Sequence, residues 1–300
     1  MQDNYQSFFG CQYPIIEACM NQASSISLAW SVNRHGAFPS IWCSVRDFQE
    51  TRENWLAYIN LVGNSQFLIP LSRSALSNYE VLKTIRDYGI SHCEILAADL
   101  DGQYSDIEAW LNNAQVKAAI KYLQLTTKVI LRIRDVIDAE KYSMFDAFSL
   151  KGSDSAGKTG VKPVRELFKE MIDLYPNSRL IPMGGVGTAE DVQWYMNNGA
   201  LAVGVGTLFA LTEESPLTSE VKNLLIRQTK PIVNLPDTEQ NCVILADKIA
   251  NENHWNRSES LKQGITGDGT QGHVYMGHGL NHVSHIRNCQ ELIDYLVSKL

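Results

Sequence analysis

Long apolar runs are missing from the sequence, and so are closely spaced cysteine pairs. No uninterrupted apolar stretch approaches the roughly 18–20 residues needed to span a bilayer, so a membrane protein is not expected. The six cysteines are scattered without a Cys-x-x-Cys pair, which is typical of reduced thiols in the cytoplasm rather than of a disulfide scaffold or a zinc site. The N-terminal residues also lack the charged-then-apolar order of a signal peptide.

Basic residues are outnumbered by acidic ones. The formal net charge is −7 and the pI is near 5.5, which argues against a nucleic-acid or anionic-membrane partner, because either would favour a basic face. Carboxylates are absent from Thr270 to Cys289, the glycine-rich segment that carries four of the seven histidines. Although His278, His282 and His285 have helical spacing, a metal is not expected there.

What is present is an alternation of short apolar runs and helix-like stretches over the first 210 residues. The runs are nearly all apolar and are bounded by proline or glycine, as expected for strands buried on both faces of a parallel sheet. The predicted strands cover residues 13–18, 39–44, 66–71, 92–98, 128–133, 146–152, 179–185 and 200–206.

Helix signals lie between most of these strands. The stretch 47–63 ends at Gly63, Thr188 is an expected N-cap, and Pro163 stands where a first helical turn should begin. Eight strands alternating with helices predict a (β/α)8 TIM barrel, with an open doubly wound sheet as the alternative. We expect the barrel over residues 1–215. Residues 216–300 would form an appended, mostly helical segment that returns a glycine-rich loop to the barrel mouth.

One short string raises a functional alternative. Residues 152–159 read G-S-D-S-A-G-K-T, which matches the phosphate-binding loop of nucleoside triphosphatases. Such a loop needs a helix that starts at the Gly-Lys pair, but Pro163 would then lie in the interior of that helix, where proline costs about 3 kcal/mol. No later strand ends in the aspartate that would hold magnesium. The nucleotide interpretation is therefore disfavoured.

Two later glycine turns are better phosphate candidates. Gly184 and Gly185 follow the seventh predicted strand, and Gly206 and Thr207 follow the eighth. Barrels often bind a phosphate at the ends of their last two strands, through backbone N–H groups and a helix N-terminus. The two consecutive turns, together with the Thr207 hydroxyl, predict a phosphate site there.

Several segments carry a family resemblance, strongest across residues 179–215. "LIPMGGVGTAEDVQWYMNNGALAVGVGTLFALTEES" is similar to the phosphate-binding block of the nitronate monooxygenase (2-nitropropane dioxygenase)-like family of FMN-dependent barrel enzymes. "PIIEACM", "DAFSLKGSDSAGKTG" and "GDGTQGHVYMGHGLNHV" resemble its opening motif, its glycine loop and its C-terminal glycine loop.

The resemblance implies FMN across the barrel mouth, with roles for particular residues. The phosphate would lie on Gly184, Gly185, Gly206 and Thr207. The backbone of Ala18, Cys19 and Met20 would line the flavin ring, Arg132 would stand where the family has a lysine near it, and Gly157, Gly277 and Gly279 would approach or close over the ring. A cation beside a reduced flavin is physically sensible, since that ring carries negative charge.

The main departure from the family is Lys158, which stands where the family has its catalytic histidine. A histidine with a pKa near 6.5 accepts a proton at neutral pH, whereas a lysine near 10.4 does so only if burial or a positive neighbour lowers its pKa. Arg132 or Lys151 is a candidate neighbour. Lys158 is thus a candidate base, acid or anion-binding group, or has no chemical role.

The resemblance implies an FMN-dependent oxidoreductase that oxidises alkyl nitronates or a related small anion with O2. The alternatives are an FMN-dependent enoyl reductase of fatty-acid or polyketide synthesis, with NAD(P)H as donor, and a flavin-binding barrel without the family's chemistry. No nucleic-acid or membrane partner is expected, and a homodimer is left open.

Overall fold

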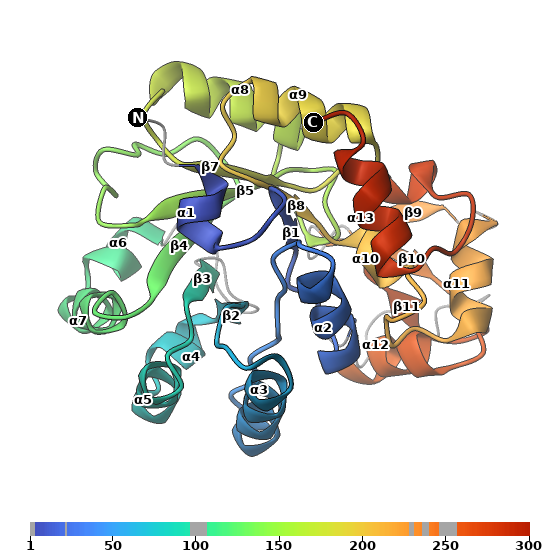
Figure 1. The fold of residues 1–300 in the computed structure, drawn as a ribbon, viewed down its shortest axis with the longest axis horizontal. Helices are drawn as coiled ribbons and strands as arrows, with labels where there is room; N and C mark the ends of the chain where they lie inside the picture. The colour runs from blue at the N-terminus through green and yellow to red at the C-terminus, as the bar shows by residue number, and fades with distance from the viewer. Residues whose placement is uncertain (1–3, 22, 97–106, 228–230, 236–239, 246–256) are drawn as a thin grey trace.

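The computed structural model describes residues 4–21, 23–96, 107–227, 231–235, 240–245 and 257–300. Seven parallel strands form one sheet in the order β1-β8-β7-β5-β4-β3-β2, which curls into a ring (Figure 1). The strands are β1 (Ile15–Glu17), β2 (Leu68–Leu71), β3 (His92–Leu96), β4 (Lys128–Ile133), β5 (Ala147–Lys151), β7 (Leu180–Met183) and β8 (Val203–Val205). Each lies within a predicted strand, although residues 97 and 98 fall outside the described residues.

The ring is closed by a short extended segment between β1 and β2. Phe38 bridges to Ile16 of β1, and Ser40 bridges to Leu68 of β2, both in parallel. Glu17 N donates to Phe38 O at 2.8 Å, and Leu68 N donates to the carbonyl of residue 39 at 2.9 Å. The strand predicted over 39–44 is therefore shorter than predicted and begins one residue earlier. It nevertheless takes the position of the eighth strand of a TIM barrel.

Helices surround the ring as the pattern predicted (Figure 1). A left-handed Gly63 (φ 78°) ends α3, and Thr188 with Asp191 forms a capping box at the start of α9. Pro163 stands just before α8. The helices of the barrel part are α2 (Ile26–Arg34), α3 (Phe48–Val62), α4 (Arg73–Leu76), α5 (Tyr79–Asp87), α6 (Ile107–Asn112), α7 (Ala114–Leu123), α8 (Val164–Leu174), α9 (Ala189–Asn197) and α10 (Thr207–Ala210).

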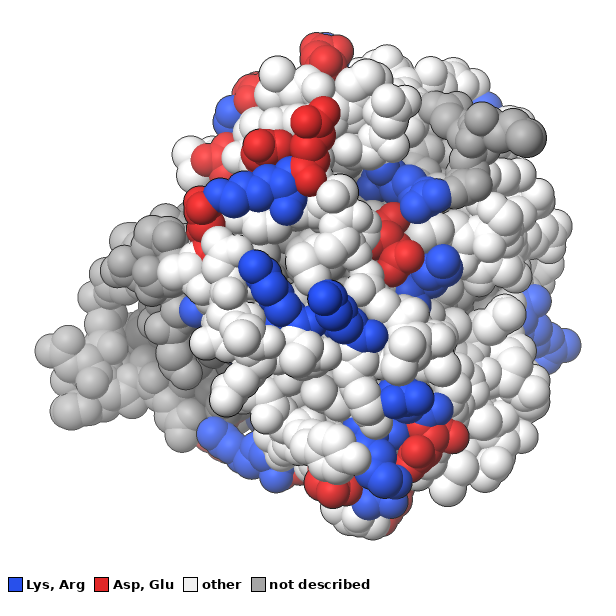
Figure 2. Space-filling model, turned by 90° about the vertical axis from the view of Figure 1, so that its left-hand side faces the viewer, with Lys and Arg blue, Asp and Glu red and all other residues white. Residues whose placement is uncertain are grey.

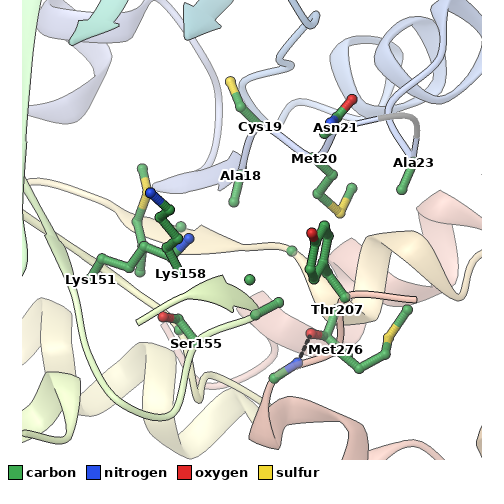
Figure 3. A pocket seen from close by; sticks show the side chains of 18 of the residues that line it. Ala18, Cys19, Met20, Asn21, Ala23, Lys151, Ser155, Lys158, Thr207 and Met276 are labelled. Atoms are coloured by element: carbon green, nitrogen blue, oxygen red, sulfur yellow. Dashed lines mark hydrogen bonds between the residues drawn. The ribbon is translucent and has the colours of Figure 1, made fainter. Parts of the chain in front are cut away.

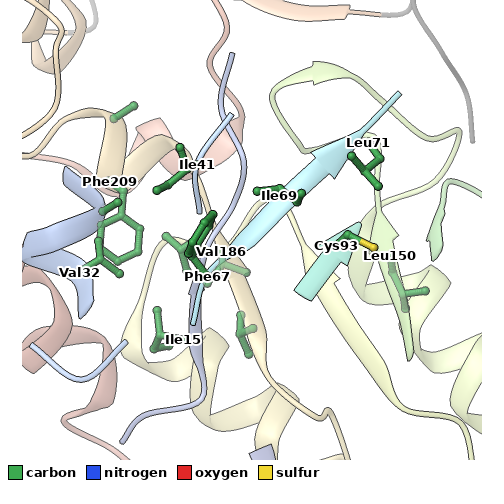
Figure 4. Close-up of a cluster of buried hydrophobic side chains, with 14 of the residues drawn as sticks. Ile15, Val32, Ile41, Phe67, Ile69, Leu71, Cys93, Leu150, Val186 and Phe209 are labelled. Carbon is green, nitrogen blue, oxygen red and sulfur yellow. The ribbon is translucent and has the colours of Figure 1, made fainter. Parts of the chain in front are cut away.

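Alternate strand residues build two cores. Those that face outward, such as Ile69 and Leu150, pack with helix residues such as Val32 in the larger cluster (Figure 4). Those that face inward, such as Leu68 and Ile130, form a smaller cluster inside the barrel. The amino-terminal end of the barrel is plugged by α1 (Tyr5–Phe9), whose two buried phenylalanines belong to the inner cluster.

The described part of the chain after β8 contains several helices, and it also contains strands that the sequence did not predict. A small antiparallel sheet has the order β11-β10-β6, with β9 also paired to β10. Its strand β6 (Gly157–Lys158) belongs to the barrel part. The C-terminal elements are α11 (Ser219–Ile226), β9 (Ile232–Leu235), β10 (Gln240–Ile244), α12 (Arg257–Thr266), β11 (His273–Val274), the 3-10 helix η3 (His278–His282) and α13 (Cys289–Val297).

The last helix returns to the barrel. Helix α13 packs against α9 and α2, the helices that follow β7 and β1, so it occupies the place of the helix that should follow β8 in a barrel ring. Its buried residues are Cys289, Leu292, Ile293 and Leu296. The predicted division of the chain at residue 215 stays a prediction.

The face on the left of Figure 1 carries charges of both signs, as the space-filling view shows (Figure 2). Basic and acidic side chains both occur on it. Pairs such as Lys83 with Asp87 lie on exposed helix surface. Such exposed pairs contribute little to stability. None of the helices in the described parts of the chain is both long and apolar enough to cross a bilayer.

Candidate functional site

The inner face of the barrel becomes polar toward the carboxyl ends of the strands. Glu94 on β3 is fully buried and accepts two hydrogen bonds from Arg132 on β4, one of them from Nε to Oε1 at 2.9 Å. Ser149 on β5 also donates to Glu94 Oε1. Because only 14% of the Arg132 side chain is exposed, Arg132 is an interior cation held by a bidentate carboxylate and not a surface arginine.

A cavity of about 240 Å³ lies at this end of the barrel. It is lined by the loop after β1, by the ends of several strands, and by residues of the C-terminal segment. All twelve residues that the sequence predicted for the site line this one cavity (Figure 3): Ala18, Cys19, Met20, Arg132, Gly157, Lys158, Gly184, Gly185, Gly206, Thr207, Gly277 and Gly279. The structure brings the whole set together, while the group that each residue binds stays a prediction.

The loop after β1 is fixed by a buried carboxyl group. Glu17 Oε1 accepts a hydrogen bond from Ser24 Oγ at 3.0 Å, and Ser24 Oγ accepts one from Met20 N at 3.2 Å. Glu17 Oε2 accepts from Ser40 N at 3.2 Å. Burial raises the pKa of Glu17 to about 8, because the charged form loses its hydration. Glu17 therefore ties the pocket loop to the strand that closes the barrel.

Gly184 and Gly185 are required by packing against the glycine loop. Both have positive φ, 115° and 66°. A Cβ on Gly184 would lie 2.4 Å from Ser155 Cβ, and one on Gly185 would lie 2.2 Å from Asp154 Oδ2. These two glycines are therefore needed, first of all, because residues 154–155 pack closely against them.

Gly206 is different. Its φ is −112°, which any residue adopts, and a Cβ there would come no closer than 3.6 Å to Ala18 Cβ. Neither the backbone nor the packing requires a glycine at this position. A longer side chain would instead take up space in the cavity that Gly206 lines.

Thr207 links this turn to the C-terminal segment. Its Oγ1 accepts a hydrogen bond from Gly277 N at 3.0 Å (Figure 3). A Cβ on Gly277 would lie 2.7 Å from Asp154 O, so Gly277 packs directly on the glycine loop. Among the described residues, the backbone N–H groups of Gly185 and Thr207 have no hydrogen-bond partner. Two donors at the lining of the cavity are therefore available to an acceptor.

The Gly-Lys pair of the glycine loop lies in a strand and not at a helix start. Lys158 and Gly157 form β6, which pairs with residues 240–241 of β10, and α8 begins only at Val164. The nucleoside triphosphatase geometry is thus absent. Asn241 holds the loop instead, since its buried Nδ2 donates to Ser153 O at 2.7 Å and to Ser155 O at 2.9 Å.

Cations gather on one side of the cavity. Arg134 and Lys151 line it together with Arg132 and Lys158, and the two lysine side chains lie on the side away from Met20 and Thr207 (Figure 3). Burial, and after it the positive charge of Arg132, lower the pKa of Lys151 to about 7. Lys151 is thus a lining lysine with a lowered pKa, and the sequence indicated it only as a candidate neighbour of Lys158.

A sequence signal for Lys151 does exist. On β5, Ala147 and Ser149 face the barrel interior, so strand alternation places Lys151 on the same inner face, at the carboxyl end. No comparable signal was present for Asn241, because a local pattern does not reveal which distant loop a hairpin will pair with.

The histidine-rich segment does not form a metal cluster within the described residues, where no group of three or more His, Cys, Asp or Glu side chains could hold an ion. His273 is fully buried and shares a hydrogen bond of 2.9 Å between its Nδ1 and Ser260 Oγ.

Fold and pocket together define a TIM barrel with a cavity at the carboxyl ends of its strands. Several solved structures share the fold over almost the whole chain. FabK from Thermotoga maritima matches with a TM-score of 0.79 at 17% identity, covering 98% of this chain and 94% of its own. Nitroalkane oxidase from Streptomyces ansochromogenes matches with a TM-score of 0.74 at 14% identity, covering 98% and 97%.

A third similar structure is the enoyl reductase domain of MlnA from the macrolactin biosynthesis cluster of Bacillus amyloliquefaciens, with a TM-score of 0.72 at 10% identity and 98% and 95% coverage. No protein-family model matches the chain, and no curated protein matches it. At these identities the similarity shows the fold, and function has to be argued from the site.

Proposed function

We propose that the chain is an FMN-dependent oxidoreductase resembling nitronate monooxygenases, which oxidises alkyl nitronates or a related small anionic substrate with O2. The observation that carries the proposal is the cavity at the strand ends, which combines glycine turns, N–H groups without partners among the described residues, and a cluster of cations. A phosphate-bearing cofactor and an anionic substrate are the two ligands that such a lining suits.

The lining fits FMN in three respects. Gly206 leaves space that the protein does not need for itself, and the N–H groups of Gly185 and Thr207 suit phosphate oxygens. The phosphate would lie beside Gly184, Gly185, Gly206 and Thr207. The backbone of residues 18–20 would line the ring, and Gly157, Gly277 and Gly279 would surround it. When bound, the flavin would take electrons from the substrate and pass them to dioxygen.

The side chains of this protein would bind and orient the substrate. Lys151, Lys158 and Arg134 stand in the lining beside Arg132, whose charge Glu94 already offsets. The charges of Lys158 and Arg134, together with the partly protonated Lys151, favour an anionic group in a partly closed cavity, since the interaction is stronger there than in bulk water. Lys158 would be an anion-binding group or a proton donor in this arrangement. In this proposal the protein is cytoplasmic, and a homodimer stays open.

An FMN-dependent enoyl reductase is the second candidate, because two of the similar structures are FabK and an enoyl reductase domain. NAD(P)H would then be the electron donor. A barrel that binds flavin without chemistry is the third, and the lysine at position 158 is the feature that favours it.

An absorbance spectrum of the purified protein tests the cofactor first. A colourless protein that also fails to bind added FMN would rule out both oxidoreductase functions. With flavin present, anaerobic mixing with ethyl nitronate and, separately, with NADPH decides between them. Bleaching by ethyl nitronate supports the proposed function, bleaching by NADPH alone supports the enoyl reductase, and bleaching by neither supports the binding barrel.

A further inference from the structure

Lys151 lines the cavity from the carboxyl end of a barrel strand. Lys151 is the last residue of β5, two residues after Ser149, which donates a hydrogen bond to the buried Glu94. Its Nζ lies 3.9 Å from where a Cβ on Gly157 would be, so it reaches the residue next to Lys158. Among the described residues, Lys151 Nζ has no hydrogen-bond or ion-pair partner. As far as the described residues go, this amine is therefore open to a ligand in the cavity.

The charged groups around this amine are mostly positive. Arg132 and Arg134 on and after β4, and Lys158 on β6, disfavour its ammonium form, while the carboxylate of Glu94 on β3 favours it. On the other side, β7 presents the uncharged Met183 at the paired position. A large share of Lys151 is consequently a neutral amine near pH 7, which is the form that accepts protons.

Other titratable groups of the lining are less suited to this task. Burial raises the pKa of Cys19 well above its usual value and that of Cys43 to about 12, so both stay neutral thiols. Arg132 and Arg134 do not lose their protons in proteins. Lys158 is on the two-residue strand β6, which the hairpin partner β10 holds.

We propose that Lys151 accepts the α-proton of a neutral nitroalkane in this cavity, so that the protein forms its own nitronate substrate. The inference rests on the proposed function and names the residue that carries out the first step of the reaction. The C–H bond breaks, its electron pair moves to the carbon–nitrogen bond, the negative charge passes to the nitro oxygens, and the proton forms an N–H bond on Lys151. The resulting ammonium and the neighbouring Lys158 then stabilise the anion.

Hydrogen exchange on the substrate tests this step without any flavin chemistry. Nitroethane is incubated with the protein in D2O, and the loss of its α-protons is followed by NMR across a pH series. We expect the rate to rise with a midpoint near pH 7. Lys151→Met should lower it on the order of 100-fold, the usual scale for a positioned base. Lys151→Arg should lower it equally, since arginine keeps the charge but cannot accept a proton.

Lys158→Met is the matched comparison, because it removes one positive charge from the same cavity. Lys158 contributes to lowering the pKa of Lys151, so its removal should move the midpoint to higher pH. The exchange at the plateau should fall less than in Lys151→Met, because the anion loses one stabilising charge while the base remains. Unchanged exchange in Lys151→Met, or loss of exchange in Lys158→Met alone, would overturn the proposal. Flavin bleaching by preformed ethyl nitronate reports on the oxidoreductase function separately, so the two failures are distinguishable.

Discussion

Glu17 shows how a single buried carboxyl group can make stability depend on pH. The group accepts hydrogen bonds from Ser24 and Ser40 but has no ion-pair partner among the described residues. Since burial raises its pKa from 4.5 to about 8, the folded state holds a proton that the unfolded state releases between these values. Its contribution to stability is fully present below pH 4.5 and is lost as the pH rises through 8.

Glu17→Gln should therefore flatten the fall in the free energy of unfolding between pH 5 and pH 8, because glutamine does not titrate. Urea unfolding followed by circular dichroism at several pH values measures this slope. Glu53→Gln on the exposed surface of α3 is the control and should leave the slope as in the parent protein. An equal slope in Glu17→Gln would show that Glu17 is charged in the folded state.

Gly206 offers a way to fill the cavity without disturbing the fold. Gly206→Leu should weaken FMN binding on the order of 100-fold or more, about 2.7 kcal/mol, while the melting temperature of the free protein changes little, since a Cβ at this position makes only ordinary contacts. Gly206→Ala is the matched control and should bind FMN far better than the leucine variant. Quenching of FMN fluorescence measures both affinities, and equal affinities would place the cofactor elsewhere.

At the scale of single residues, the sequence predicted which residues meet at the cavity. It was less successful in predicting why particular residue types stand at these positions. Gly184 and Gly185 were identified as phosphate-binding glycines, yet the Cβ positions explain them by contact with Ser155 and Asp154. Lys151, whose pKa is lowered by burial, was indicated only as a candidate neighbour of Lys158. A pKa depends on burial and on charges from several strands, which no local pattern contains.

Among the elements, the hairpin β9–β10 determines how the glycine loop is held. The buried Asn241 of β10 donates hydrogen bonds to the carbonyls of Ser153 and Ser155. Asn241→Ala leaves two carbonyls without these donors, which should cost about 1–3 kcal/mol and speed the opening of β6. Hydrogen exchange of the Gly157 and Lys158 amides, together with thermal unfolding, measures the two effects.

Asn234→Ala is the matched control for Asn241. It removes only the hydrogen bond of 2.9 Å that Asn234 Nδ2 donates to Asn241 Oδ1, and both bonds to the loop remain. We expect a smaller loss of stability and little change in amide exchange within β6. Equal effects of the two substitutions would mean that Asn241 acts through the hairpin and not through the loop carbonyls.

Strand and helix positions were predictable because their signals are local. Short apolar runs marked every barrel strand, and Thr188 and Gly63 marked helix ends that the structure confirms. The small sheet was missed because β6 and β11 have only two residues each. Pairing with β10, which is distant in sequence, defines these two strands, and a period of two cannot be read from two residues.

For the whole molecule, the ring of helices is complete only when the end of the chain returns. Helix α13 packs against α2 and α9 and also contacts α10, which carries Thr207. The barrel and the chain after residue 215 should therefore unfold together, in one transition that also releases bound FMN. The sequence predicted the return of a glycine-rich loop to the barrel mouth but not the return of α13, since an amphipathic helix does not reveal which surface will cover it.

Ile293→Ala tests this coupling at the centre of α13. Ile293 is fully buried, so its truncation should lower the free energy of unfolding by about 2–5 kcal/mol. Asp294→Ala, on the exposed side of the same helix, should change it by less than about 0.5 kcal/mol. If α13 completes the barrel, circular dichroism and FMN release will move to lower temperature together in Ile293→Ala. A shift in only one of the two signals would mean that the C-terminal segment and the barrel unfold as separate units, since a shared core forces them to melt as one.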